Sequence, residues 1–249
     1  MCPNDKIVEK QRYNERSKVI LDGGFDSLEV ERVPLYLLPP IQSYRAFLSE
    51  EDSSCMVLEL GAGTGEHTQH LLDLGMFVFA TDISPASVAL MKKKFGAYPN
   101  FFAQIADMEC LPFADKSFDL VCSAGSLSYG ENQLVMDSIY RVLKKRGSFV
   151  AMDSLNHNPV YKLNRFLHYL RGNRSKSTLI RMPTLRLIGN YRRKFGSLRD
   201  EYFGALVWLC PVLEIFFSER MTASISSAFD KFVGVKRASF KFTLKVTKK

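Results

Sequence analysis

The segment Leu58–Thr68, with the sequence LELGAGTGEHT, decides the fold class of this chain. It follows an apolar run typical of a buried strand and precedes a helical pattern. Gly61, Gly63 and Gly65 can adopt positive φ angles, and their missing Cβ atoms let a ligand lie against the backbone. We therefore expect a ligand-binding turn between a strand and a helix.

Short β-rich runs alternate with longer helical patterns around this turn. The expected strands cover residues 56–60, 77–81, 101–105, 118–123 and 148–153, and the expected helices cover about 65–75, 85–95 and 131–144. This alternation is typical of a parallel sheet with crossover helices. The sequence therefore predicts a doubly wound α/β sheet.

The alternation ends after residue 154. Helical patterns occur in LNRFLHYLRG (163–172) and around VLEIFF (212–217), with a basic loop between them. Residues 240–246 then alternate apolar and polar side chains, which predicts a half-buried strand. We expect a helical basic insertion after the fifth strand, and then an antiparallel C-terminal strand that returns to the sheet.

The distribution of charge divides the chain. It has 249 residues, of which 46% are hydrophobic and 24% charged, as in a folded globular protein. Residues 1–150 hold 15 basic and 20 acidic side chains, whereas residues 151–249 hold 19 and 6. We expect a single domain overall with three parts, namely an N-terminal helical cap segment (1–54), a core (55–153) and a C-terminal acceptor-binding part (154–249).

No Asp or Glu occurs between Ser154 and Leu198, where ten cations lie. They are Lys162, Arg165, Arg171, Arg174, Lys176, Arg181, Arg186, Arg192, Arg193 and Lys194. A surface of one sign predicts an anionic partner, such as an anionic acceptor, a phosphate-bearing carrier or an acidic membrane surface. Nucleic acid is not expected, because the segment has no recognisable RNA-binding module and few aromatic residues spaced for base stacking.

The cysteines and the apolar segments indicate the compartment. Five cysteines occur without a CxxC pair, so we expect neither a disulfide framework nor a metal site. The N-terminus is charged throughout and lacks the apolar stretch of a secretory signal. The most apolar segment, Tyr202–Phe217, is shorter than the roughly 20 residues of a membrane-spanning helix. We expect a cytoplasmic protein, with peripheral contact at the inner membrane face as an alternative.

The acids near the glycine turn indicate the cofactor. Asp82 follows Gly63 by 19 residues and ends the second expected strand, where a carboxylate can accept hydrogen bonds from both ribose hydroxyls. The third glycine of a GxGxxG motif would fall at Glu66, whose carboxylate would repel a pyrophosphate. S-adenosylmethionine carries no phosphate, and Glu59 suits its positively charged part. This pattern favours S-adenosylmethionine over a nicotinamide dinucleotide.

The chain resembles class I S-adenosylmethionine-dependent methyltransferases in their consecutive motifs. The residues that carry the resemblance are Glu59, Gly61, Gly63 and Gly65, then Asp82, then Asp107-Met108, and then FDLV at 118–121. The resemblance covers residues 55–153 and implies a Rossmann-like methyltransferase sheet. The segment ADMECLPFADKSFDLV is similar to the branch that contains ubiquinone and menaquinone C-methyltransferases and many small-molecule O-methyltransferases.

The resemblance also implies the cofactor contacts. Asp82 would bind the ribose, Ile83 would pack on the adenine, and Asp107 would accept from the adenine amino group with Met108 beside it. The expected cofactor-binding residues are Glu59, Gly61, Ala62, Gly63, Gly65, Asp82, Ile83, Asp107, Met108 and Ser123.

We expect the methyl acceptor to bind outside the carboxyl ends of the fourth and fifth strands, near the segments 124–130 and 153–161. Segment 124–130 lacks the Asn/Asp-Pro-Pro-aromatic sequence of amino-methylating nucleic-acid enzymes. Segment 153–161 contains the candidate catalytic residues Asp153, His157 and Tyr161. His157 has the pKa best suited to removing a hydroxyl proton near neutral pH, although a loop histidine bonded to backbone is an equal alternative.

The C-terminal part adds a second resemblance. The block MDSLNHNPVYKLNRFLHYLRGNRSKSTLIRMP resembles methyltransferases encoded with bacterial surface-polysaccharide enzymes. It implies O-methylation of a sugar hydroxyl on a phosphate-bearing small molecule or glycan. The alternatives are methylation of a quinone or lipid-like ring, a non-catalytic partner subunit that binds S-adenosylmethionine, and a nicotinamide dehydrogenase.

Overall fold

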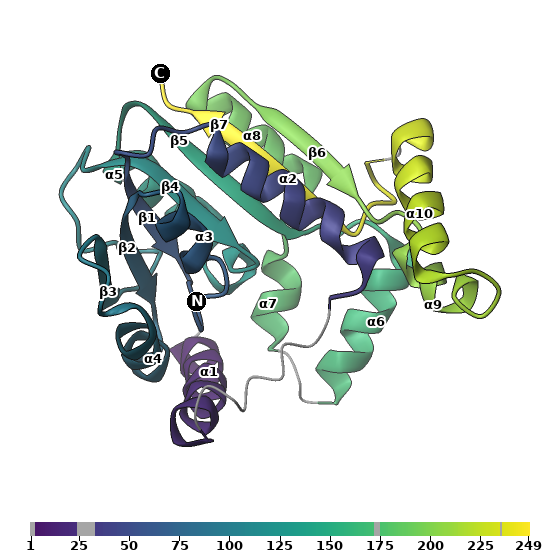
Figure 1. Cartoon of the computed structure of the whole chain (residues 1–249), viewed down its shortest axis with the longest axis horizontal. Coiled ribbons are helices and arrows are strands. Elements are labelled where there is room, and N and C mark those ends of the chain that lie inside the picture. The colour runs from purple at the N-terminus through teal and green to yellow at the C-terminus, as the bar shows by residue number, and fades with distance from the viewer. Residues whose placement is uncertain (1–2, 24–32, 172–174, 235) are drawn as a thin grey trace.

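A seven-stranded sheet with helices on both faces forms the body of the molecule (Figure 1). The computed structural model describes residues 3–23, 33–171, 175–234 and 236–249. The strands are β1 (Met56–Leu60), β2 (Phe77–Asp82), β3 (Phe101–Ile105), β4 (Phe118–Ala124), β5 (Leu143–Ser154), β6 (Arg199–Phe203) and β7 (Lys241–Thr247). Their order across the sheet is β3-β2-β1-β4-β5-β7-β6.

The pairing of the strands confirms the predicted fold class. Strands β1 to β5 pair in parallel, and β7 pairs antiparallel with β5. Strand β6 pairs antiparallel with β7 and was not predicted. Its sequence, RDEYF, begins with three charged residues and does not alternate, because it lies at the sheet edge with no fully buried side chain.

The helices occupy the connections and the C-terminal part. They are α1 (Pro3–Gly23), α2 (Leu38–Ser49), α3 (Thr68–Asp73), α4 (Pro85–Phe95), α5 (Asn132–Val142), α6 (Pro159–Leu170), α7 (Lys176–Arg181), α8 (Leu185–Phe195), α9 (Cys210–Leu213) and α10 (Glu219–Val233). The described residues also form short 3-10 turns, η2 (Leu35–Leu37), η3 (Leu127–Tyr129) and η4 (Val207–Leu209).

Local sequence explains where the core helices begin and end. The Ser84 hydroxyl accepts from the Ser87 amide at the start of α4, and Pro85 takes the first helical position. Helix α5 begins after Glu131, whose carboxylate accepts from two amides of the first turn. It ends at Val142, two residues before the expected end, because Leu143 is extended and starts β5.

Two apolar layers cover the two faces of the sheet. One packs Leu58, Val121 and Phe149 against buried residues of α5 and α8. The other packs Val57, Val78 and Cys122, which point to the opposite face, against α2, α3 and α4. The carboxyl ends of the parallel strands lie at one edge of the sheet, where a ligand site can form.

The C-terminal part differs from the expected one in two respects. The helix expected around VLEIFF is only the four-residue α9, and α10, which was not predicted, follows it. The ten cations do not form one open face, because Arg165 is buried and donates to the Leu155 carbonyl (3.0 Å), and Lys194 pairs with Asp137. Arg174 lies outside the described residues.

None of the helices among the described residues is long and apolar enough to cross a membrane. Within the same ranges, no group of three or more His, Cys, Asp or Glu side chains could hold a metal ion. Cys55, Cys110, Cys122 and Cys210 carry free thiols, and Cys2 lies outside the described part.

Candidate cofactor site

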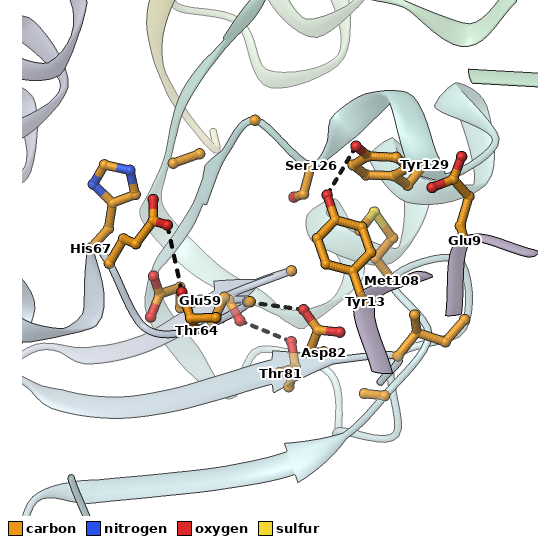
Figure 2. A pocket seen from close by; sticks show the side chains of 18 of the residues that line it. Glu9, Tyr13, Glu59, Thr64, His67, Thr81, Asp82, Met108, Ser126 and Tyr129 are labelled. Carbon is orange, nitrogen blue, oxygen red and sulfur yellow. Dashed lines mark hydrogen bonds between the residues drawn. The ribbon is translucent and has the colours of Figure 1, made fainter. Parts of the chain in front are cut away.

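A pocket opens at the carboxyl ends of β1, β2 and β4 (Figure 2). Eight of the ten expected cofactor residues line it, namely Glu59, Gly61, Ala62, Gly63, Asp82, Ile83, Asp107 and Met108. The structure thus brings together residues that lie at the ends of β1 and β2 or in the segments after β1, β2 and β3. Their roles toward a cofactor stay predictions, since the geometry describes only the protein.

Asp82 is held by backbone amides at the end of β2. Its Oδ2 accepts from the Gly63 amide at 2.9 Å, and its Oδ1 accepts from the Ser84 amide at 2.8 Å. Burial raises the pKa of this carboxyl, and the two amide contacts oppose that rise. A fixed carboxylate beside the glycine loop can accept further hydrogen bonds from a ligand.

Glu59 is the second buried acid of the pocket. The Thr68 hydroxyl donates to its Oε2 at 2.6 Å. Burial raises the pKa of Glu59 to about 7, the Thr68 hydrogen bond opposes this shift, and the charge of Asp82 adds to it. A cationic ligand group near this carboxyl would stabilise its ionised form.

The three glycines of the loop have different tasks. All three have positive φ angles, of +61° at Gly61, +57° at Gly63 and +78° at Gly65. A Cβ on Gly63 would meet no atom within 4 Å, so the backbone is bare there. A Cβ on Gly65 would lie 2.4 Å from the Phe95 ring. Gly65 was expected to line the pocket, but it does not. Its missing Cβ instead allows α4 to pack closely against the loop.

Ser123 also differs from its expected place. It is fully buried, and its hydroxyl shares a hydrogen bond of 2.7 Å with that of Ser126. Ser126 donates to the Leu60 carbonyl at 3.0 Å and lines the pocket itself. Ser126 therefore lines the pocket in place of Ser123. It follows Ser123 by three residues and belongs to the segment 124–130.

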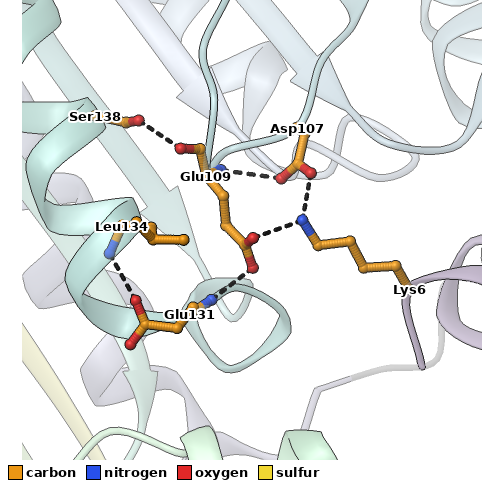
Figure 3. Close-up of polar contacts among 6 residues, drawn as sticks. All are labelled: Lys6, Asp107, Glu109, Glu131, Leu134 and Ser138. Carbon is orange, nitrogen blue, oxygen red and sulfur yellow. Dashed lines mark hydrogen bonds and ion pairs between the residues drawn. The ribbon is translucent and has the colours of Figure 1, made fainter. Parts of the chain in front are cut away.

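Asp107 belongs to a small network of charges beside the pocket (Figure 3). Lys6 of α1 forms ion pairs with Asp107 and with Glu109, the latter at 2.6 Å. The Glu109 amide donates to the other oxygen of Asp107 at 3.0 Å. The Asp107 carboxylate is thus oriented from two sides, one of them an N-terminal helix that lies far away in the sequence.

Helix α1 forms one wall of the pocket, which the sequence did not predict. Lys6, Glu9, Tyr13 and Arg16 line the pocket from this helix. Ser17 shares a hydrogen bond of 2.9 Å with Ser87 of α4, against which α1 lies (Figure 1). The sequence of α1 is polar on all sides and has no clear apolar stripe that could have indicated its place.

The three candidate catalytic residues lie outside the pocket lining. The ring Nε2 of His157 accepts from the Leu185 amide at 3.0 Å, at the start of α8. Burial lowers the pKa of His157, and Lys162 and Arg237 lower it further. This is the geometry of the alternative weighed for His157, a loop histidine bonded to backbone, and its role as a general base stays a prediction.

Asp153 and Tyr161 are likewise bonded to backbone. Asp153 is buried and accepts from the amides of Leu127 (2.9 Å) and Ser154 (2.6 Å). The Tyr161 hydroxyl donates to the Gly204 carbonyl at 3.1 Å and accepts from the Trp208 amide at 3.0 Å. Burial raises the pKa of both groups. The Asp153 bonds join the end of β5 to the segment after β4, and the Tyr161 bonds join α6 to residues 204–208.

A histidine that the sequence did not single out does line the pocket. His67 precedes α3, and burial lowers its pKa to about 4, with Arg45 and Lys241 adding to the effect and Glu66 opposing it. Its imidazole is therefore neutral near pH 7. The position of His67 inside the glycine loop LELGAGTGEHT could have indicated that it lies near the cofactor.

Comparison with known proteins identifies the core. A family model described as a methyltransferase domain matches residues 58–151. Residues 58–151 are a class I methyltransferase domain. The S-adenosylmethionine expected from the sequence is the cofactor of this domain class. The chemistry of the pocket suits it, because the backbone at Gly63 is bare and the buried carboxyl groups of Glu59 and Asp82 can attract a cation and accept hydrogen bonds from hydroxyls.

Two curated relatives share this methyltransferase domain. An uncharacterised methyltransferase-like protein of Schizosaccharomyces pombe is 35% identical over 97 residues, which are 39% of this chain and 37% of the relative. The ubiquinone/menaquinone biosynthesis C-methyltransferase of Blochmanniella pennsylvanica is 33% identical over 118 residues, or 44% and 46% of the two chains. The chain thus spans less than half the length of these relatives.

The similarity of fold extends beyond the methyltransferase domain. A methyltransferase of Haloferax volcanii, solved in complex with the activator Trm112, has a TM-score of 0.61 and 20% identity. The match covers 95% of this chain and 99% of that one. At this level of identity the comparison concerns the fold, including the C-terminal helices and strands.

Proposed function

We propose that this chain is an S-adenosylmethionine-dependent methyltransferase that acts on a small molecule. The observation that carries the proposal is the placement of two buried carboxyl groups, Glu59 and Asp82, around the bare backbone of Gly63. Asp82 would accept hydrogen bonds from the ribose hydroxyls, and Glu59 would face the cationic part of the cofactor. When bound, the cofactor supplies a methyl group already activated on a sulfonium.

The remaining lining residues have assignable tasks. Ile83 and Met108 would pack on the adenine, and Asp107, oriented by Lys6, would accept from its amino group. We assign residues 55–153 to cofactor binding and residues 154–249 to acceptor binding. We assign residues 1–54 to the cap, because side chains of α1 form one wall of the pocket. The cap would exclude water from the reaction and hold the acceptor in line.

For the acceptor we favour a quinone or other lipid-like ring. A relative that shares the domain is named for ubiquinone and menaquinone C-methylation, and the C-terminal helix α6 exposes apolar side chains. A carbon acceptor also needs no strong general base, and the candidate base His157 does not line the pocket. The polar groups that do line it, His67, Tyr13 and Tyr129, would orient the acceptor.

The phosphate-bearing sugar expected from the sequence has less support as acceptor. It depends on the ten cations of the C-terminal part, of which Arg165 is buried and Lys194 is paired with an acid. A sugar hydroxyl would also need a base, and the candidates Asp153, His157 and Tyr161 are all bonded to backbone. Both acceptor classes can be compared in one assay.

Calorimetry with S-adenosylhomocysteine tests cofactor binding. Asp82→Ala should weaken binding by about 10-fold to 100-fold, since it removes charge-assisted hydrogen bonds. Asp119→Asn is the matched control, because Asp119 pairs with Lys144 and does not line the pocket. Equal affinity in both variants would remove Asp82 from the cofactor site.

Transfer of a labelled methyl group tests the reaction. A short-chain demethylmenaquinone and a nucleoside diphosphate sugar serve as the two acceptors. We expect labelled quinone and unlabelled sugar. Labelling of the sugar alone would reverse the choice of acceptor, and binding without transfer to any acceptor would favour a non-catalytic partner subunit.

A further inference from the structure

The segment between α9 and α10 carries three consecutive apolar residues on a protruding turn (Figure 1). Ile215 and Phe216 are each 74% exposed, and Phe217 is 41% exposed. We name these three residues the apolar tip. Isolated exposed apolar side chains are ordinary on protein surfaces, but three in a row on a turn form a contiguous patch that marks an interaction site.

The backbone of the tip is already hydrogen-bonded within the turn. The Ile215 amide donates to the Val212 carbonyl at 3.2 Å, and the amides of Phe216 and Phe217 donate to the Leu213 carbonyl at 3.0 and 2.8 Å. Amides that are paired within a turn can leave water without losing their hydrogen bonds. This property suits an environment that offers no hydrogen-bond partners.

Helix α6 adds a second apolar surface to the same part of the molecule. Its exposed side chains recur at helical spacing, with Leu163 60%, Leu167 41% and Leu170 63% exposed. Its opposite side is anchored, since the buried Tyr161 bonds to Gly204 and to Trp208. These bonds also place Trp208, which is 45% exposed, next to α6.

The charges around these apolar surfaces are mostly positive. Lys162 and Arg171 are exposed at the two ends of the apolar face of α6, and Arg220 is exposed in the first turn of α10, next to the tip. Of the acids between residues 204 and 234, Asp230 accepts from two backbone amides and Glu219 accepts from the Leu35 amide. Glu214 is the exposed acid of this segment. An apolar surface with a cationic border complements an anionic bilayer.

We propose that the apolar tip and the exposed face of α6 dock this protein on an anionic lipid bilayer, with the tip inserted at the headgroup boundary. A second copy of the chain is a poorer occupant, because a symmetric pair would place the same cations against each other. The inference does not depend on the proposed acceptor.

Co-sedimentation of the full chain with vesicles tests the proposal. Vesicles of phosphatidylcholine with 30% phosphatidylglycerol should retain the protein, and retention should fall in high salt and on pure phosphatidylcholine. The double variant Ile215→Ser/Phe216→Ser should bind about tenfold or more weakly, because it removes two large apolar side chains from the inserted tip. Both side chains are largely exposed, so the fold should persist, and unchanged S-adenosylhomocysteine binding verifies this.

Leu134→Ser is the matched control, since Leu134 is 48% exposed on α5 and lies away from the tip. It should bind vesicles like the unaltered chain. Trp208, the single tryptophan, gives a second readout, because its fluorescence should shift to shorter wavelength on binding. Absence of vesicle binding, or equal binding by the double variant, would overturn the proposal. A dimer in solution that the double variant converts to monomer would make the tip an interface between copies instead.

Discussion

The hydroxyl of Tyr13 donates to the hydroxyl of Tyr129, with the two oxygens 2.9 Å apart. The two rings meet edge to face with centroids 5.6 Å apart, and Arg12 donates to the same Tyr129 oxygen at 3.2 Å. This contact joins α1 to the segment after β4, across one end of the pocket (Figure 2). We expect α1 to close the pocket through it.

Tyr13→Phe should therefore speed the dissociation of S-adenosylhomocysteine. It keeps the ring but removes the donor, and a net loss of about 0.5–1.5 kcal/mol corresponds to roughly 2-fold to 10-fold. Stopped-flow displacement measures the rate. Tyr98→Phe is the control, because the Tyr98 hydroxyl bonds to Gln69 outside the pocket. If both variants release the ligand at the unaltered rate, α1 does not retain the cofactor.

Cofactor affinity should depend on pH through Glu59. Its pKa of about 7 in the ligand-free protein means that the carboxyl gains a proton as the pH falls through 7. A cationic ligand favours the ionised carboxylate, so binding is full above pH 7 and weakens below it, by up to about tenfold per pH unit. Calorimetry with S-adenosylmethionine, which carries the sulfonium cation, between pH 5.5 and 8 measures this slope.

Glu59→Gln supplies the control for that slope and a test of its cause. The variant should bind more weakly and lose the pH dependence below 7. Because the folded-state pKa of Glu59 lies above that of the unfolded chain, unaltered protein loses stability as the pH rises toward 7. Ligand-free Glu59→Gln should therefore melt at a higher temperature than unaltered protein at pH 8. A lower melting temperature would contradict the assigned burial cost.

Gly63→Ala and Gly65→Ala should separate ligand binding from folding. Both positions have positive φ, which costs an alanine roughly 1–2 kcal/mol. Gly65→Ala also drives a methyl group into the Phe95 ring, so it should lower the free energy of unfolding by several kcal/mol. Gly63→Ala meets open space and should lose mainly cofactor affinity. Urea unfolding and calorimetry distinguish the two, and equal destabilisation would refute the division of tasks.

His157→Ala should change turnover by no more than a few-fold. The histidine accepts the Leu185 amide at the start of α8 and does not line the pocket, so its loss should cost about 1 kcal/mol of stability. His157→Gln, which retains an acceptor, should recover part of that stability. A drop in turnover of about 100-fold or more, with cofactor affinity intact, would instead restore His157 as the general base.

The sheet and most of the cofactor pocket could be predicted because they depend on local patterns. Strand β1 and the glycine loop are adjacent in sequence, and Asp82 ends the next strand, so spacing alone brings Gly63 and Asp82 together. The same spacing could not distinguish a glycine that faces a ligand from one that faces a ring. Gly65 was therefore assigned to the pocket although Phe95 occupies its open side.

Contacts between distant segments could not be predicted in the same way. Lys6 reaches Asp107 across 101 residues, and the sequence of α1 has no apolar stripe that would indicate a neighbour. Strand β6 has charged residues because it is an edge, and an edge pattern resembles a loop. A histidine in a loop has the same sequence pattern whether it faces a substrate or a backbone amide, as His157 does.

The strand order has a consequence for synthesis on the ribosome. Strand β7 is made after β6 but lies between β5 and β6 in the sheet. A nascent chain that has emerged only as far as residue 240 therefore exposes the unpaired edge of β5, whose apolar residues Phe149 and Val150 are fully buried later. Such an edge is a template for wrong pairing between chains. Strand β7 thus protects the edge of β5 from pairing with other chains.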